Sequence, residues 1–362
     1  MRESSIVVRP EPVQSATYTP SSRLQAAGLA PAVALFEQAA AEVPLPKPPQ
    51  PIVIADYGAA TGHNSLLPVC AAIAVIRRRT RPEHAILVTH TDLPGNDFTA
   101  LFRTLSEDPD SYLHKDPASF SSAIGRSYYA QILPSSSVRL GWTSWATMWL
   151  SRTPTDLPDH VQVAYSSDDA ARAAYAHQAA RDWQAFLAFR GRELCLGGRL
   201  VVLTMAVGDD GEFGYRPLLD ALVAALEDRH RNGLLSADEL RRMTIPTFAR
   251  AEKDFRAPFA PKGRFEGLSI EHLQVFNAED RFCARYLVDH DATAFGAQWA
   301  AFARAAVFPA LVTSLDGGPT DPRAIGLVEH LETAVAERLS SAPAPMQIPL
   351  ASVVLVKHGP SH

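Results

Sequence analysis

The sequence predicts an α/β fold with a largely parallel, Rossmann-like sheet, and three stretches carry this prediction. Residues 52–57 form a short apolar strand that passes through a glycine turn into an amphipathic helix. A second short strand, 85–89, is followed closely by an acid. A third strand, entered at Gly197-Gly198, follows a long helix over 169–193. Strands that alternate with helical patterns are typical of βαβ units and a parallel sheet.

The first strand and its turn indicate a nucleotide-type cofactor. Asp56 stands near the carboxyl end of the strand, where it can accept hydrogen bonds from ligand hydroxyls or an amine. Gly58 and Gly62 can adopt positive φ and let a ligand approach the backbone. The G-x-G-x-x-G spacing that binds a pyrophosphate is absent, which favours S-adenosylmethionine. The alternative is that both glycines only permit close packing of strand and helix.

The second strand also ends in polar residues. It runs into His90-Thr91-Asp92-Leu93-Pro94-Gly95-Asn96-Asp97-Phe98. Because neighbouring strand ends meet at the ligand crevice of a doubly wound sheet, we expect Asp92 to lie beside Asp56. One acid would face the amino-acid end of the cofactor and the other its ribose. The alternative for Asp92 is an ordinary turn acid before Pro-Gly.

Aromatic residues gather after the strand predicted over 137–142. Trp145, Met148, Trp149 and Leu150 fall at one-face helical spacing, a pattern that usually indicates core packing. Each indole carries an N–H that needs a partner when buried. A binding pocket is therefore as good an interpretation as plain core, with Trp142 included among its walls and Leu218, Ile245 and Phe308 as further apolar candidates.

Composition excludes several classes of function. Of 362 residues, 47% are hydrophobic and 20% charged, which indicates a globular chain. The net charge of −5 offers no basic surface for nucleic acid. The three cysteines lie far apart, so we expect neither disulfides nor a metal site. No run resembles a signal peptide or a membrane span, and we expect a soluble, cytoplasmic protein.

The remaining patterns divide the chain into four parts. We expect a lid segment and helix in 1–50, a cofactor-binding core in 51–207, a mainly helical cap in 208–316, and a closing helix and strand in 317–362. The predicted elements beyond those above are helices over 29–42, 66–76, 217–231, 295–312 and 322–339, a helix starting at 236, a surface loop over 106–122, an irregular connection over 245–267 and a terminal strand over 350–357.

The chain resembles the SABATH family of S-adenosylmethionine-dependent carboxyl methyltransferases. The resemblance covers most of the chain, in the family's order and near its spacing. Its most specific stretch is the run Asp92-Leu93-Pro94-Gly95-Asn96-Asp97-Phe98. The other stretches are Tyr18-x-x-x-Ser22-x-x-Gln25, Ala55-Asp56-x-Gly58-x-x-x-Gly62-x-Asn64, Ser127-Tyr128-Tyr129 and Ser144-Trp145-Ala146-Thr147-Met148-Trp149-Leu150-Ser151.

The resemblance implies a class I methyltransferase fold, a seven-stranded Rossmann-like sheet under a helical cap. It implies S-adenosylmethionine as cofactor, S-adenosylhomocysteine as product, and a possible homodimer. It assigns cofactor binding to Tyr18, Ser22, Asp56, Gly58, Asn64, Asp92, Leu93, Ser127 and Tyr128. Gln25 and Trp149 match the clamp on the substrate carboxylate, and Trp145 and Met148 match the pocket walls.

The departures from the family concern the substrate. Trp145 replaces the usual tyrosine, Thr61 and His63 stand where Ser-Gly-Pro is common, and the glycine-rich start before Tyr18 is missing. We expect methylation of a lipophilic acid, with medium-chain fatty acids ahead of benzoate- or salicylate-type acids. The alternatives are methylation of a nitrogen or oxygen on a heterocycle, or a catalytically silent protein that binds S-adenosylmethionine.

Overall fold

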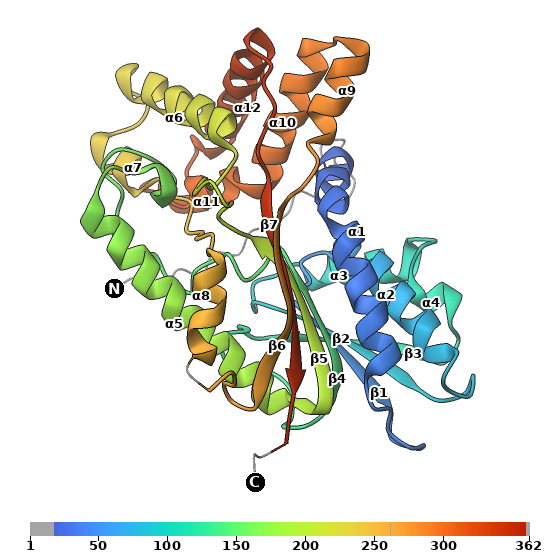
Figure 1. Ribbon diagram of the computed structural model, residues 1–362. Helices are drawn as coiled ribbons and strands as arrows, with labels where there is room; N and C mark the ends of the chain where they lie inside the picture. Colours follow the sequence, from blue (N-terminus) through green and yellow to red (C-terminus); the bar gives the residue numbers. More distant parts are fainter. Residues whose placement is uncertain (1–17, 261, 360–362) are drawn as a thin grey trace.

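A seven-stranded mixed sheet forms the centre of the molecule (Figure 1). The computed structural model describes residues 18–260 and 262–359, with side chains from residue 29 onward. The strand order is β3-β2-β1-β4-β5-β7-β6; β7 runs antiparallel to both of its neighbours, and the other pairs are parallel. This confirms the predicted α/β class. The strands are β1 (Ile52–Tyr57), β2 (Ile86–Asp92), β3 (Ser119–Gly125), β4 (Val138–Ser144), β5 (Leu194–Met205), β6 (Leu268–Asn277) and β7 (Pro349–Lys357).

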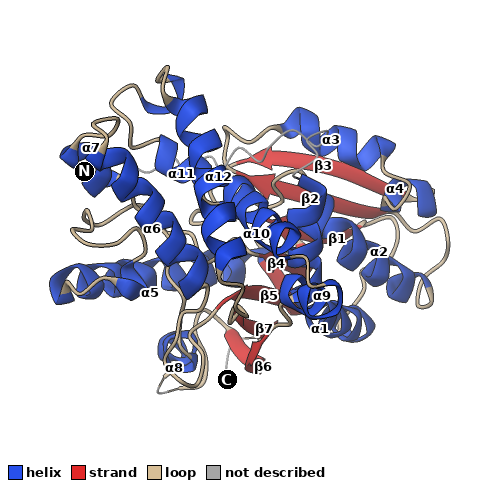
Figure 2. Cartoon of the chain, turned by 90° about the horizontal axis from the view of Figure 1, so that it is seen from above, coloured by secondary structure: helices blue, strands red, loops and turns tan. Residues whose placement is uncertain are grey.

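Helices cover both faces of the sheet and the end where the parallel strands finish. Figure 2 shows α1 to α4 on one side of the sheet and α5 and α8 on the other. Helices α6, α9, α10 and α12 stand beyond the sheet in Figure 1 and form the cap. The helices are α1 (Tyr18–Glu42), α2 (His63–Arg77), α3 (Phe98–Glu107), α4 (Tyr112–Lys115), α5 (Asp169–Glu193), α6 (Arg216–Arg231), α7 (Ala237–Arg242), α8 (Glu252–Arg256), α9 (Arg281–Asp289), α10 (Ala292–Ala306), α11 (Phe308–Val312) and α12 (Ala324–Ser341).

Both faces of the central strands are buried, as expected when helices cover a parallel sheet on each side. On the α1 face, Trp142 of β4 packs against Phe36 with ring centroids 5.0 Å apart. On the α5 face, Tyr57 of β1 meets the ring of Phe186 edge-on at 6.3 Å. Trp142 is fully buried in this core. It is not among the described residues that line the pocket between the sheet and the cap, in contrast to the prediction.

Four local predictions differ from the structure. The stretch 106–122 is not a loop throughout, because it contains α4 and the start of the polar edge strand β3. Residues 145–150 form a turn rather than a helix, since Trp145 has φ +57°, outside the helical range. Gly197-Gly198 lies inside β5 instead of preceding it, and helix α1 begins eleven residues before the predicted 29.

The cap and the sheet draw on overlapping parts of the chain. Helix α12 packs against α10 and α6 in the cap, whereas β6, which was not predicted, joins the sheet beside β7. Region 208–316 thus contributes a strand as well as helices, and the domain boundaries stay a prediction. Among the helices that the structure describes, none is long and apolar enough to cross a membrane.

Candidate functional site

The carboxyl ends of β1 and β2 place the two predicted acids next to each other. These strands pair in parallel, with Tyr57 opposite Thr91, so Asp56 and Asp92 reach the same edge of the sheet. The backbone N–H groups of Gly58 and Ala59 both donate to the Thr91 carbonyl, at 2.8 and 3.0 Å. These bonds hold the turn after β1 against the end of β2, and the expected neighbourhood of the two acids is present.

The turn after β1 depends on its glycines. Gly58 has φ +83° and Gly62 has φ +81°, a region that costs glycine nothing. A Cβ added to Gly58 would lie 2.5 Å from the Cβ of Ala146, so the turn also needs the missing side chain. Ala60 between them has φ +48°, uncommon for a residue with a side chain. Both glycines therefore serve close packing in any case, Gly58 against the loop after β4 and Gly62 against Leu101 of α3.

Asp92 is anchored through its own loop. One carboxylate oxygen accepts the Ala60 N–H and the other accepts the Leu93 N–H, each at 2.7 Å. Burial raises the pKa of the Asp92 carboxyl above its ordinary value, although the two N–H donors oppose this effect. Each carboxylate oxygen keeps a second lone pair, which suits hydroxyl donors such as those of a ribose. Asp92 and its neighbours thus fit an S-adenosylmethionine site.

Asp56 is fixed by a buried chain of hydrogen bonds that the sequence did not predict. His90 Nδ1 lies 2.8 Å from Asp56 Oδ2, and His90 Nε2 lies 3.0 Å from the Tyr112 hydroxyl. All three side chains are almost completely buried. A carboxylate oxygen accepts, so Nδ1 serves as the donor to Asp56. Residues two apart on a strand share a face, so the pattern of β2 could have placed His90 on the same buried face as Val88.

The turn after β4 is held at four consecutive carbonyls. The oxygens of residues 146–149 accept, in chain order, from the Tyr128 hydroxyl at 2.8 Å, Arg250 Nη1 at 2.7 Å, the Phe248 N–H at 2.9 Å and the Tyr129 hydroxyl at 2.5 Å. Burial raises the pKa of both tyrosine phenols, which keeps them as donors. The turn therefore presents its side chains from a rigid frame.

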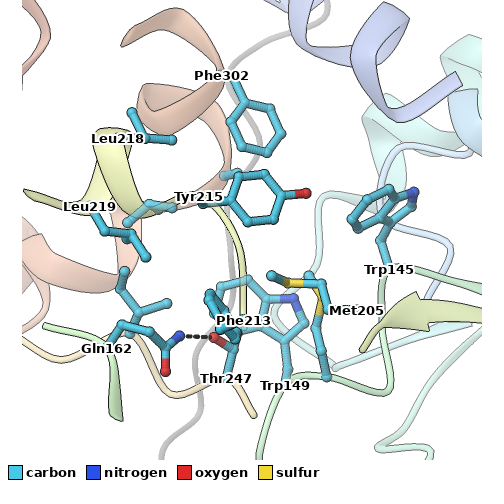
Figure 3. A pocket seen from close by; sticks show the side chains of 14 residues that line it. Trp145, Trp149, Gln162, Met205, Phe213, Tyr215, Leu218, Leu219, Thr247 and Phe302 are labelled. Atoms are coloured by element: carbon cyan, nitrogen blue, oxygen red, sulfur yellow. Dashed lines mark hydrogen bonds between the residues drawn. The ribbon is translucent and has the colours of Figure 1, made fainter. Parts of the chain in front are cut away.

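A pocket lies between this turn and the cap (Figure 3). Its space amounts to about 540 Å³, part of which opens to solvent. None of the described side chains that line it carries a charge. The lining residues are Trp145, Met148, Trp149, Gln162, Met205, Phe213, Tyr215, Leu218, Leu219, Ile245, Thr247, Phe302, Ala306 and Val307.

The polar groups of the pocket are few. Gln162 Nε2 donates to Thr247 Oγ1 at 2.8 Å, and both side chains are buried. The indole N–H of Trp145 and the hydroxyl of Tyr215 have no hydrogen-bond partner among the described residues. The backbone of Trp145 and that of Tyr215 adopt φ +57° and +58°. Such strain in non-glycine residues is concentrated at functional sites.

The pocket includes several of the residues predicted for it. Trp145, Met148, Trp149, Leu218 and Ile245 line it, whereas Phe308 is fully buried and does not. Sequence reasoning missed the residues contributed by distant loops and strand ends and by the cap helices α6 and α10. Of these, only Met205 had a usable signal, because it ends a buried strand. The missed residues are Gln162, Met205, Phe213, Tyr215, Leu219, Thr247, Phe302, Ala306 and Val307.

The remaining predicted site residues have varied surroundings. Asn64 is the second residue of α2, and Ser127 Oγ accepts the Tyr129 N–H at 3.2 Å. Tyr18, Ser22 and Gln25 fall on the first turns of α1, and their side chains lie outside the described residues. Their assigned roles, like those of the other site residues, stay predictions.

Sequence comparisons agree with the chemistry of the site. A family model described as SAM dependent carboxyl methyltransferase matches residues 11–353. Salicylate carboxymethyltransferase of Clarkia breweri is 26% identical over 235 residues, which span 62% of this chain and 63% of that protein, less than two thirds of its length. Anthranilate O-methyltransferase 1 of Zea mays is 26% identical over 285 residues, spanning 72% and 74% of the two chains.

The fold is also similar to that of a solved structure. A loganic acid methyltransferase with S-adenosylhomocysteine superposes with a TM-score of 0.74 at 20% identity, over 96% of this chain and 98% of that one. This similarity supports the fold, and the family model covers most of the chain. The chain therefore belongs to the family of S-adenosylmethionine-dependent carboxyl methyltransferases, the SABATH enzymes that its sequence resembles.

Proposed function

We propose that the protein transfers a methyl group from S-adenosylmethionine to the carboxylate of a lipophilic small acid and releases a methyl ester. The observation that carries this proposal is the pocket beside the cofactor loops, in which no described lining residue is charged. Such a pocket suits an acid with an apolar body. It also suits a reaction in which a positive and a negative charge cancel.

None of the described residues that line the pocket is a general base, which fits a carboxylate acceptor. A carboxylic acid with an unperturbed pKa of about 4 is already ionised near neutral pH, so no proton has to be removed. When bound, S-adenosylmethionine supplies an electrophilic methyl group on a positively charged sulfur, open to direct SN2 attack. Asp92 and Asp56, at adjoining strand ends, would hold its polar groups.

The substrate carboxylate needs donors that orient it. Trp149 lines the pocket from the rigid turn after β4, and Gln25 is its proposed partner in the clamp. Neutral N–H donors align the carboxylate without a fixed positive charge, which would stabilise the charged ground state more than the transition state. The apolar walls exclude water, which strengthens these few hydrogen bonds.

Among lipophilic acids, we place medium-chain fatty acids ahead of aromatic acids. Flexible or aliphatic side chains, Met148, Met205, Leu218 and Leu219 among them, form much of the wall and can follow an alkyl chain. Aromatic acids are the second candidate class. The lining contains five aromatic side chains, and relatives are named for salicylate, benzoate and anthranilate.

The test is a panel of carboxylic acids incubated with labelled S-adenosylmethionine and read by mass spectrometry. Labelled methyl esters are the expected products. Label on a nitrogen or a phenolic oxygen of a heterocycle would replace carboxyl methylation by the alternative reaction. Cofactor binding without any labelled product from the panel would favour a silent binding protein.

Location and assembly are part of the same proposal. We expect a cytoplasmic protein, and the family resemblance admits a homodimer. Cell fractionation tests the first, and light scattering on the purified protein tests the second.

A further inference from the structure

One hydroxyl in the pocket wall, that of Tyr215, has no role in the proposed reaction. The Tyr215 hydroxyl has no hydrogen-bond partner among the described residues, although only 4% of the residue is exposed. Figure 3 shows this hydroxyl within the pocket, directed toward the ring of Trp145. An unpaired buried hydroxyl is unfavourable, because the group has given up its bonds to water. A ligand oxygen would supply the missing partner.

The backbone holds Tyr215 in a conformation that is strained for a residue with a side chain. Gly214 and Tyr215 both have positive φ, +86° and +58°, directly before α6. The Tyr215 N–H donates to the Gln347 carbonyl at 3.0 Å, and the Gly214 carbonyl accepts the Tyr165 hydroxyl at 2.8 Å. A Cβ on Gly214 would lie 2.4 Å from the Gln347 oxygen. This turn fixes the direction in which the Tyr215 side chain leaves the cap.

The ring of Tyr215 is confined as firmly as its backbone. Phe302 stacks on it with a centroid distance of 6.1 Å and an interplanar angle of 7°, and Trp299 meets it edge-on at 6.1 Å. Phe213 packs at 6.3 Å. These contacts use only the ring, so the hydroxyl adds nothing to the packing. Its position is set in advance, which makes it suited to recognition.

The chemistry of the pocket indicates the kind of atom that Tyr215 would meet. Burial raises the pKa of the Tyr215 phenol, so the group stays protonated and donates. Thr247 accepts from Gln162, which leaves the threonine proton available as a second donor. No described lining residue is positively charged, so a second carboxylate would lack a counter-charge. A neutral oxygen fits best.

We propose that Tyr215 is a specificity-determining residue whose hydroxyl donates a hydrogen bond to a neutral oxygen, such as a ketone, carried on the apolar body of the acid. This inference rests on the proposed carboxyl methylation and names the preferred members of its substrate class. A site built to bind an oxygen discriminates against the analogue without it far more than an apolar wall can.

The experiment compares octanoate with oxo-octanoates whose ketone lies at carbon 4, 5, 6 or 7. We expect wild-type kcat/KM to be at least about tenfold higher for one or more oxo isomers than for octanoate. Tyr215→Phe keeps the ring contacts and should lower kcat/KM for those isomers by about 10- to 100-fold. The value for octanoate should change by less than about threefold.

The melting temperature distinguishes recognition from a merely structural role of the hydroxyl. A structural role predicts a lower Tm when the hydroxyl is removed, and a role in recognition predicts a higher one. Tyr215→Phe removes an unpaired buried hydroxyl, so it should raise the Tm of the ligand-free protein. The matched control is Tyr175→Phe outside the pocket, because the Tyr175 hydroxyl donates to the Thr155 carbonyl at 3.0 Å and its loss should lower the Tm. A lower Tm for Tyr215→Phe would overturn the proposal.

The kinetic outcomes separate the inference from the proposed function. Equal losses for octanoate and for the oxo acids would show that the hydroxyl serves the common carboxylate, which overturns the inference alone. If Tyr215→Phe has the same kcat/KM as wild type for all of these acids, the inference is overturned as well. If the wild-type enzyme forms no methyl ester from any acid, the proposed function fails and the inference falls with it.

Discussion

His90 Nδ1 lies 2.8 Å from Asp56 Oδ2, in a buried contact between neighbouring strands at the edge where the cofactor is expected. His90→Leu would leave the Asp56 carboxylate buried without this donor. We expect the free energy of unfolding to fall by about 1–3 kcal/mol, with weaker cofactor binding. Denaturant unfolding and calorimetry with S-adenosylhomocysteine measure both effects.

Two further variants show whether the Nδ1 donor is responsible. His90→Asn keeps an N–H near the position of Nδ1 and should recover much of the loss. Tyr112→Phe removes only the far end of the chain and should have the smaller effect. If Asn and Leu at position 90 behave alike, the hydrogen bond to Asp56 contributes nothing measurable.

Asp92→Ala should abolish measurable binding of S-adenosylmethionine while the protein stays folded. The variant removes a carboxylate that also holds the Ala60 and Leu93 N–H groups at the cofactor edge. Asp97→Ala is the matched control, because Asp97 only caps α3 through the Ala100 N–H. It should lose about 1 kcal/mol of stability and keep its affinity. Normal affinity in a folded Asp92→Ala protein would refute the assignment.

These predictions depend on features that the sequence shows unequally. Asp56 and Asp92 could be predicted because acids at the ends of parallel strands meet at one edge. His90 Nδ1 could not be paired with Asp56 without the strand register. Gln162, Tyr215 and Thr247 come together from three distant segments, and no local pattern relates them.

The missed strands have equally specific causes. In β6 the register shifts between Ile270 and His272, which breaks the alternation that would have revealed the strand. The other edge strand, β3, is rich in serine and mostly half-exposed, so it lacks an apolar face. Helix α5, by contrast, spans the predicted residues 169–193. The Asp168 side chain accepts the N–H groups of Ala170 and Ala171 at its start.

The proposed carboxylate clamp can be tested on both of its members. Gln25→Ala and Trp149→Ala each remove a neutral donor to a charged acceptor, an interaction worth about 1.5–3 kcal/mol. The specificity constant for the acid should fall by about one to two orders of magnitude, with cofactor affinity nearly unchanged. Trp149→Phe keeps an aromatic ring and isolates the indole N–H. Equal loss of cofactor affinity would indicate structural roles instead.

Stability should fall at low pH through Glu239 in the cap. Hydrogen bonds from Arg323 hold the pKa of the buried Glu239 carboxyl at about 2, below its ordinary 4.5. A carboxyl whose pKa is lower in the folded state stabilises that state at any pH above its ordinary pKa of 4.5. This contribution disappears as the pH falls from 4.5 toward 2. Glu239→Gln should therefore lower the free energy of unfolding by about 1–3 kcal/mol at pH 7.

Denaturant unfolding across pH 7 to pH 2 checks the sign of this effect. The difference between Glu239→Gln and wild type should shrink below about pH 4.5. Asp238→Asn is the control, since Asp238 is exposed and pairs only with Arg241 on the surface. The free energy of unfolding of Asp238→Asn should stay close to that of wild type from pH 7 to pH 2. If the difference in free energy of unfolding between Glu239→Gln and wild type is the same at every pH, the charge of Glu239 does not cause the loss of stability.

The length of the pocket should appear in the response to acyl chain length. Each further methylene buried among side chains such as Leu218, Leu219 and Phe302 contributes about 0.8 kcal/mol, or roughly a fourfold gain in affinity. The apparent affinity should therefore climb from hexanoate through octanoate to decanoate until the apolar wall is filled. Steady-state kinetics at saturating S-adenosylmethionine measures this series. A flat response across the three acids, beside strong turnover of salicylate, would contradict the fatty-acid preference and favour an aromatic acid as the substrate.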